Sequence, residues 1–148
     1  MMKNLLKTSL LFFLLAGCSE EEGMLCDTGP VIFTFEVVEA ASGENVFESG
    51  VYKVGQMEIA DKAGKAVDFE LAENGVLKVL LGWEAKSDVY TVTIADEVEF
   101  DIIFRLEESR GEFCSSTVIK DLEVVGLPSE TSGTTGITTI YVQALTGE

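Results

Sequence analysis

The chain has 148 residues, 47% of them hydrophobic, with 26 acidic against 10 basic residues and a formal net charge of −16. Such an acidic chain lacks the basic surface that binding to nucleic-acid phosphates requires, and anionic membrane surfaces repel it. It has no histidine, which excludes a Ser-His-Asp triad, Cys-His catalysis and a histidine-bound zinc centre within this chain.

Residues 1–17 have the pattern of a secretory signal peptide. Lys3 and Lys7 give a positively charged start, and residues 10–16 form an apolar core. This core is far shorter than the roughly 20 apolar residues that a membrane-spanning helix needs. We therefore expect residues 1–17 to be a signal helix that is removed from the mature protein.

Cys18 ends the sequence Leu-Leu-Ala-Gly-Cys, which resembles the lipobox of bacterial lipoproteins. The resemblance implies that Cys18 carries a diacylglycerol thioether, that cleavage occurs before it, and that its new amine is acylated, for example with palmitate. Each buried CH₂ of these chains contributes about 0.8 kcal/mol, so three chains make attachment effectively permanent. The alternative is an ordinary leader in which a cysteine falls at this place by chance.

An acidic tether, residues 18–25, follows the leader. Its residues Ser19, Glu20, Glu21 and Glu22 resemble the export signal of surface lipoproteins in flavobacteria and related Bacteroidota. The resemblance implies a protein that is lipid-anchored in the outer membrane and displayed on the cell surface. The alternative is a solvated tether on a lipoprotein that faces the periplasm. In layout, the whole chain is similar to the small β-rich lipoproteins of the Bacteroidota.

Residues 26–148 have the length of one domain with a substantial core. The mature chain carries eight basic and 26 acidic residues, a net charge of −18, which keeps a surface protein soluble and self-repelling. The acids are scattered without a D-x-D-x-D-G calcium loop, so the sequence favours a solvated acidic face over Ca²⁺ binding. We expect no metal and no cofactor.

Cys26 and Cys114 remain once Cys18 is assigned to lipid. Two remaining cysteines in an exported domain predict a disulfide, which would tie the start of the domain to a late strand. Two free thiols are the alternative. A metal site is disfavoured because the chain offers neither histidine nor a third free cysteine.

The rest of the chain alternates apolar and polar residues in short runs, which predicts β-strands. Phe33, Phe35 and Val37 fall on one face of the first run, for example, and Asn74-Gly75 is a strong hairpin signal. The expected strands are residues 31–39, 51–60, 66–71, 76–81, 89–94, 98–106, 113–125 and 137–145.

These strands, spaced by about ten residues and with no helix expected after the leader, predict an all-β fold. We expect an antiparallel two-sheet sandwich of about 7–8 strands, of immunoglobulin-like or transthyretin-like type. Residues 38–46 (Val-Glu-Ala-Ala-Ser-Gly-Glu-Asn-Val) resemble the first hairpin of carboxypeptidase regulatory-like domains, which share the transthyretin-like sandwich.

Three stretches interrupt the strand pattern. Residues 82–88 form a break, residues 107–111 (Glu-Glu-Ser-Arg-Gly) form a polar turn, and residues 126–136 are rich in Gly, Ser and Thr. The last stretch predicts a flexible loop. It is either a mobile connector, the favoured reading, or a binding loop on a rigid sandwich.

Trp83, the only tryptophan, lies in the break at residues 82–88. If it is exposed, it is a possible ligand contact that stacks on a sugar ring. The favoured reading is a core or rim aromatic that caps the sandwich. We expect Tyr52, Tyr90 and Tyr141 at the edge of the core, with their hydroxyls in water.

Pairs of acids could in principle hydrolyse glycosides. Asp68 with Glu70, and Glu97 with Glu99, are two residues apart and share a strand face. Alternation alone places acids on polar strand faces, which also explains Asp101. The sequence contains no nucleotide-binding glycine motif, so we expect no catalytic residue.

These features together favour a non-enzymatic lipoprotein that is held in a membrane through its N-terminal lipid. We expect a binding or accessory module for a protein or glycan partner. In the Bacteroidota, many lipoproteins work beside outer-membrane transporters in polysaccharide uptake, and the resemblance implies such a setting. The alternatives are a periplasm-facing structural or envelope-maintenance lipoprotein and, disfavoured, a carboxylate-dependent hydrolase.

Overall fold

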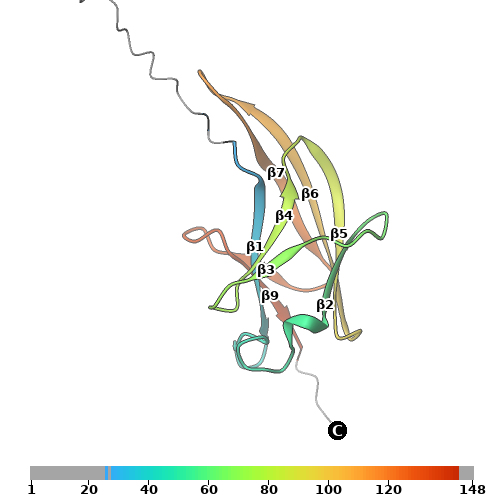
Figure 1. The fold of residues 1–148 in the computed structure, drawn as a ribbon. Coiled ribbons are helices and arrows are strands. Elements are labelled where there is room, and N and C mark those ends of the chain that lie inside the picture. The colour runs from blue at the N-terminus through green and yellow to red at the C-terminus, as the bar shows by residue number, and fades with distance from the viewer. Residues whose placement is uncertain (1–25, 27, 144–148) are drawn as a thin grey trace, which may run out of the picture.

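The computed structural model describes residues 26 and 28–143, which form an all-β sandwich of two facing sheets (Figure 1). The predicted two-sheet sandwich is confirmed. The signal helix expected in residues 1–17 lies outside the described residues. The strands are β1 (Val31–Glu39), β2 (Met57–Asp61), β3 (Phe69–Leu71), β4 (Leu77–Gly82), β5 (Lys86–Ile94), β6 (Val98–Arg110), β7 (Ser115–Val125), β8 (Ser129–Thr131) and β9 (Thr138–Val142).

The five-stranded sheet has the order β3-β4-β1-β9-β8, and the four-stranded sheet has the order β2-β5-β6-β7. Apolar side chains from the inner faces of both sheets form the core. Phe35 of β1 meets Phe100 of β6 edge to face, with ring centroids 6.1 Å apart. The alternation in the first strand put Phe35 on the inward face, as expected, and each buried side chain of this kind contributes about 1.5–3 kcal/mol.

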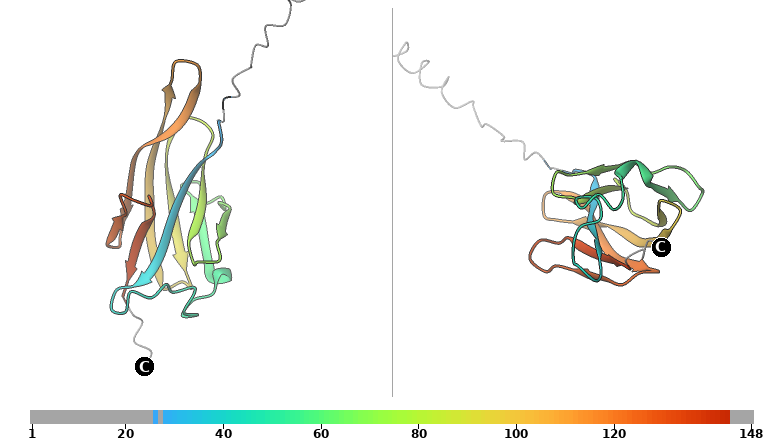
Figure 2. Two further views of the ribbon diagram at one scale, coloured as in Figure 1. Left: turned by 90° about the vertical axis from the view of Figure 1, so that its left-hand side faces the viewer. Right: turned by 90° about the horizontal axis from the view of Figure 1, so that it is seen from below.

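β1 and β9, the first and last of the described strands, lie side by side in the five-stranded sheet. β1 pairs with β9 in parallel and with β4 in antiparallel orientation. The prediction of an antiparallel sandwich is therefore wrong at this one pair. β7 ends at the opposite end of the sandwich from the start of β1 (Figure 2). β8 then runs back toward that start, and β9, which is antiparallel to β8, therefore runs parallel to β1.

β6 and β7 are the two longest of the described strands, and the hairpin that they form projects beyond the rest of the sandwich (Figure 2). Its strands pair from Asp101 with Val125 to Arg110 with Ser115. The predicted polar turn at residues 107–111 is therefore wrong, since β6 continues to Arg110. Beyond the core, both faces of the hairpin contact water. A strand in this position needs no inward-facing apolar residues, so its sequence is polar and does not alternate.

Several other boundaries differ from the sequence prediction. The expected strand at 51–60 divides into a 3₁₀ helix, η1 (Val54–Gln56), and β2. β5 begins within the expected break at 82–88, and the stretch at 126–136 contains β8. The Asn-Gly hairpin is confirmed, because Gly75 has a φ of 73° between β3 and β4. Among the described residues, no helix is long and apolar enough to cross a membrane.

Candidate functional site

An open cavity of about 350 Å³ lies at the end of the sandwich where β1 starts. Three segments form its walls: residues 28–29 before β1, the β4–β5 turn, and the projecting part of the β6–β7 hairpin. The lining residues are Thr28, Gly29, Trp83, Glu84, Ala85, Glu108, Ser115, Ser116 and Thr117. We call this the Trp83 cavity.

The β4–β5 turn presents Trp83 to the cavity. Gly82 ends β4 with a φ of 140°, a backbone conformation that side-chain-bearing residues rarely adopt. The Thr117 hydroxyl on β7 donates a hydrogen bond of 2.8 Å to the carbonyl of Trp83. Because β4 and β7 belong to different sheets, this bond holds the turn against the opposite wall.

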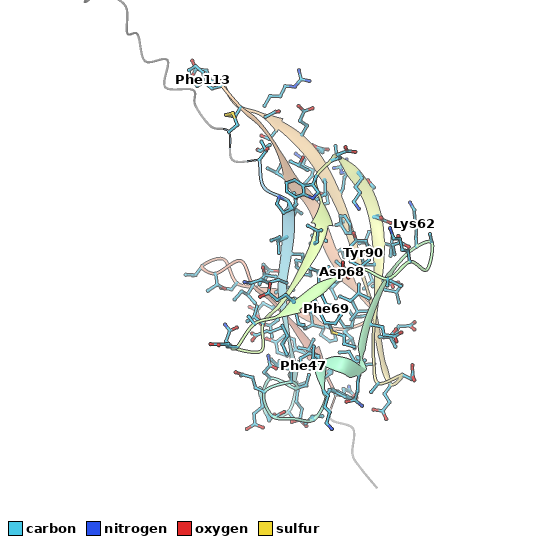
Figure 3. The ribbon with its side chains drawn as sticks, viewed as in Figure 1. Phe47, Lys62, Asp68, Phe69, Tyr90 and Phe113 are labelled. Atoms are coloured by element: carbon cyan, nitrogen blue, oxygen red, sulfur yellow. A yellow bond between two sulfur atoms is a disulfide. The ribbon has the colours of Figure 1, made fainter. Side chains whose placement is uncertain are left out.

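A cluster around Lys86 supports the turn from the core side. The Lys86 ammonium lies 5.6 Å from the ring centre of Tyr90 and 5.5 Å from that of Phe104, and it pairs with Asp88 at 3.7 Å. Tyr90 is buried between the sheets (Figure 3), and its hydroxyl donates to the carbonyl of Leu81 at 3.3 Å. The prediction that the Tyr90 hydroxyl lies in water is therefore wrong, because this hydroxyl is hydrogen-bonded to a buried backbone carbonyl.

Trp83 is 61% exposed. The favoured prediction was a core or rim aromatic. A position in the core is therefore wrong, and the ring lies at the rim of the open cavity. Leu81 is the last residue of β4 that is buried in the core, and Trp83 lies beyond it in the β4–β5 turn, beside the projecting hairpin. The reading as a possible ligand contact fits this exposure.

The chemistry of the cavity is set by one indole ring, several hydroxyls and two carboxylates. Thr28, Ser115 and Ser116 supply hydroxyls that donate or accept hydrogen bonds, and Glu84 and Glu108 supply acceptors. Glu108 lies 3.6 Å from the guanidinium of Arg110. None of the lining residues is a lysine or arginine.

The disulfide between Cys26 and Cys114 fixes one wall to another, and the prediction of this bond is confirmed. The Cα atoms of the two cysteines are 5.6 Å apart across 88 residues of sequence. Cys26 precedes Thr28, and Cys114 precedes Ser115, so the bond brings the segment before β1 against the start of β7. The alternative of two free thiols is therefore wrong.

The acid pairs considered from the sequence do not lie in the Trp83 cavity. Asp68 and Glu70 are exposed around β3, and Glu70 faces Lys78 across the strand pair. Glu97 accepts a hydrogen bond of 3.4 Å from the hydroxyl of Tyr52. Burial raises the pKa of Tyr52 above its ordinary value, and the charge and hydrogen bond of Glu97 raise it further.

Asp101 lies half-buried on the outer face of its sheet and accepts a hydrogen bond of 2.7 Å from Thr91. That contact satisfies a carboxylate without any ligand. The stretch at 126–136 takes no part in lining the cavity; β8 and a turn around Ser132, whose hydroxyl accepts from two backbone N–H groups at 3.3 Å, shape it instead.

Five of the residues singled out from the sequence lie outside the described part of the chain: Cys18, Ser19, Glu20, Glu21 and Glu22. The lipid attachment and the export signal therefore stay predictions. Within residues 26 and 28–143, no group of three or more His, Cys, Asp or Glu side chains is placed to hold a metal ion.

The sequence reading missed the hairpin wall of the cavity, Glu108 and residues 115–117. It placed a turn at residues 107–111, where Glu108 instead belongs to strand β6. Comparisons of the chain with protein-family models, with curated proteins and with solved structures found no match.

Proposed function

We propose that the chain is a non-enzymatic lipoprotein, anchored by lipid in the outer membrane and displayed on the cell surface, that binds a glycan in the Trp83 cavity. The observation that carries the proposal is the exposed indole of Trp83 on the wall of an open, hydroxyl-lined cavity. An exposed aromatic ring beside hydrogen-bonding side chains supplies the two kinds of contact that small-ligand sites combine.

A sugar ring matches both parts of this lining. The apolar C–H face of the ring packs on an indole, and its edge hydroxyls exchange hydrogen bonds with Thr and Ser side chains and donate to carboxylates. The cavity lining contains no cationic side chain, and the mature chain proposed here, residues 18–148, has a net charge of −18. Phosphate, sulfate and uronate groups would therefore be repelled, and we expect neutral glycans.

Trp83→Ala should weaken glycan binding at least about tenfold, or about 1.4 kcal/mol, because it removes the stacking surface. Binding is measured by titration calorimetry against soluble starch, mixed-linkage β-glucan, galactomannan and xylan, with an alginate as the acidic comparison. Phe113→Ala is the matched control, since Phe113 is also an exposed aromatic but does not line the cavity. Equal affinity for the wild type and Trp83→Ala, or no binding to any of the neutral polymers, would contradict the glycan proposal.

The anchoring part of the proposal is supported by the signal-like residues 1–17, by Cys18 and by the acids at 20–22. In labelled-palmitate cultures, we expect the wild type to incorporate label and Cys18→Ser to lose it, because the thioether precedes amine acylation. On intact cells, added protease should digest the wild type, whereas the variant with Glu20, Glu21 and Glu22 all changed to alanine should be protected.

Each outcome of the cell experiment selects a location. If the wild type and the triple variant are both protected until the outer membrane is broken, the protein faces the periplasm. The envelope-maintenance reading then replaces surface display. If Cys18→Ser incorporates as much label as the wild type, the lipobox assignment is wrong.

A further inference from the structure

Phe113 is a large apolar side chain that the described part of the chain leaves mostly in water. It is 69% exposed, more than any other large hydrophobic side chain among the described residues. Figure 3 shows it at the far end of the projecting β6–β7 hairpin, beyond both sheets. The tip residues 111–114 form a turn in which the backbone N–H of Gly111 donates to the carbonyl of Cys114 at 2.7 Å. That turn does not require an aromatic side chain.

The disulfide ties this tip to the N-terminal part of the chain. Cys114 follows Phe113 directly and is bonded to Cys26. Eight residues of chain lead from Cys18 to Cys26, a path of at most about 29 Å when fully extended. Cys26 therefore stays within that distance of whatever holds Cys18, and the disulfide keeps the hairpin tip beside Cys26.

We propose that Phe113 inserts into the surface of the bilayer that holds the lipid of Cys18, so that the hairpin tip contacts the membrane. This inference depends on the lipid anchoring proposed above. The occupant follows from the short chain between Cys18 and the tip. An aromatic side chain on a protein held this close to a bilayer gains by moving from water into the interfacial region.

The charges of the protein limit how deeply the tip can insert and determine which lipids favour the contact. Glu112 precedes Phe113, and Arg110 ends β6; both would carry a charge into hydrocarbon if the hairpin entered further. The contact is therefore confined to the headgroup region. Because the chain is strongly acidic, zwitterionic lipid favours the contact and anionic lipid opposes it.

Contact between the tip and the membrane would also hold the Trp83 cavity near the bilayer. Ser115, Ser116 and Thr117 line the cavity and lie within three residues of Cys114 along β7. A membrane-bound tip holds this wall near the bilayer and limits the tumbling of the whole domain about its tether. A glycan would then be bound close to the membrane surface.

The experiment uses the full lipidated protein in vesicles of phosphatidylcholine and phosphatidylethanolamine. Trp83→Phe removes the only tryptophan, and Phe113→Trp then places a single fluorophore at the tip. The matched control is Lys62→Trp in the same background, because Lys62 is exposed in the β2–β3 turn, away from the tip (Figure 3). Acyl chains brominated near the headgroup quench a nearby indole.

We expect the tip indole to be quenched at least about twofold more than the control indole, with emission shifted to shorter wavelength, as for a side chain buried in the interface. Replacing half of the lipid by phosphatidylglycerol should reduce that difference. Equal quenching at the two positions in protein that floats with the vesicles overturns the membrane contact and leaves the anchor intact. Protein that does not float with the vesicles overturns the anchor, and the membrane contact with it.

Discussion

Asn45 is the side chain on which the loop after β1 depends. It is buried, its amide donates 3.0 Å to the carbonyl of Gly75, and its carbonyl oxygen accepts from the N–H groups of Phe47 and Glu48. A Cβ on Gly75 would lie 2.5 Å from the Asn45 amide nitrogen. The glycine of the β3–β4 turn is therefore required both for its positive φ and for this close approach.

Asn45→Ala should lower the free energy of unfolding by about 2–3 kcal/mol, because it leaves three backbone groups without their partner. Asn74→Ala is the control: Asn74 is exposed in the neighbouring turn, and an effect within about 0.5 kcal/mol is expected. Urea titration followed by circular dichroism measures both. A loss for Asn45→Ala no larger than that of the control would show that water replaces the amide.

At the residue scale, the sequence predicted part of this arrangement. Residues 38–46 resembled a hairpin of another domain, and Asn74-Gly75 indicated a hairpin. The bond that joins the two turns spans 30 residues. Turn propensity describes only neighbours in the chain, so it cannot predict such a contact.

At the scale of single elements, the β5–β6 hairpin has an unusual turn. Ala95 and Asp96 have φ values of 53° and 57°, and the N–H of Glu97 donates to the carbonyl of Ile94 at 3.0 Å. Two successive residues with positive φ suit the twist of a hairpin, but this geometry favours Asn and Gly. Neither residue here is a glycine or an asparagine, so the turn is strained.

Asp96→Gly should raise the free energy of unfolding by about 1 kcal/mol, since it removes the steric cost of the left-handed conformation. Asp68→Gly is matched in charge change, and Asp68 is exposed with an ordinary φ; it should lower stability by up to about 1 kcal/mol. Thermal unfolding of the two variants beside the wild type is the measurement. The same sign of change in both would rule out strain at Asp96.

Strands that pack on the core were predictable, because burial of one face imposes alternation. In β1 the residues expected on one face, Phe33, Phe35 and Val37, are all buried. β8 was missed because its Ser-Glu-Thr sequence is exposed on both faces, and the end of β6 was missed for the same reason. Of the cavity residues, only Trp83 was predicted from the sequence as a ligand contact. The opposing wall belongs to the other sheet, and strand patterns in the sequence do not show which segments of two sheets come together.

At the scale of the whole molecule, the disulfide closes a loop that contains most of the domain. The sequence separation of Cys26 and Cys114 is 88 residues, so the bond restricts the unfolded chain strongly. Cys26→Ser should lower the free energy of unfolding by about 2–5 kcal/mol, and Cys114→Ser by the same amount. Equal melting temperatures of the wild type with and without reductant would contradict this.

The parallel pairing of β1 with β9 has a consequence for biosynthesis. β1 occupies the centre of its sheet, and one of its two neighbours is the last strand of the domain. A nascent chain that lacks residues 138–142 cannot complete this sheet, so the core stays open until nearly the whole domain has been made. Non-local pairings of this kind form slowly. If the chain is exported as proposed above, this delay keeps it unfolded, and able to pass a narrow translocation channel, until the last of its described strands has been made.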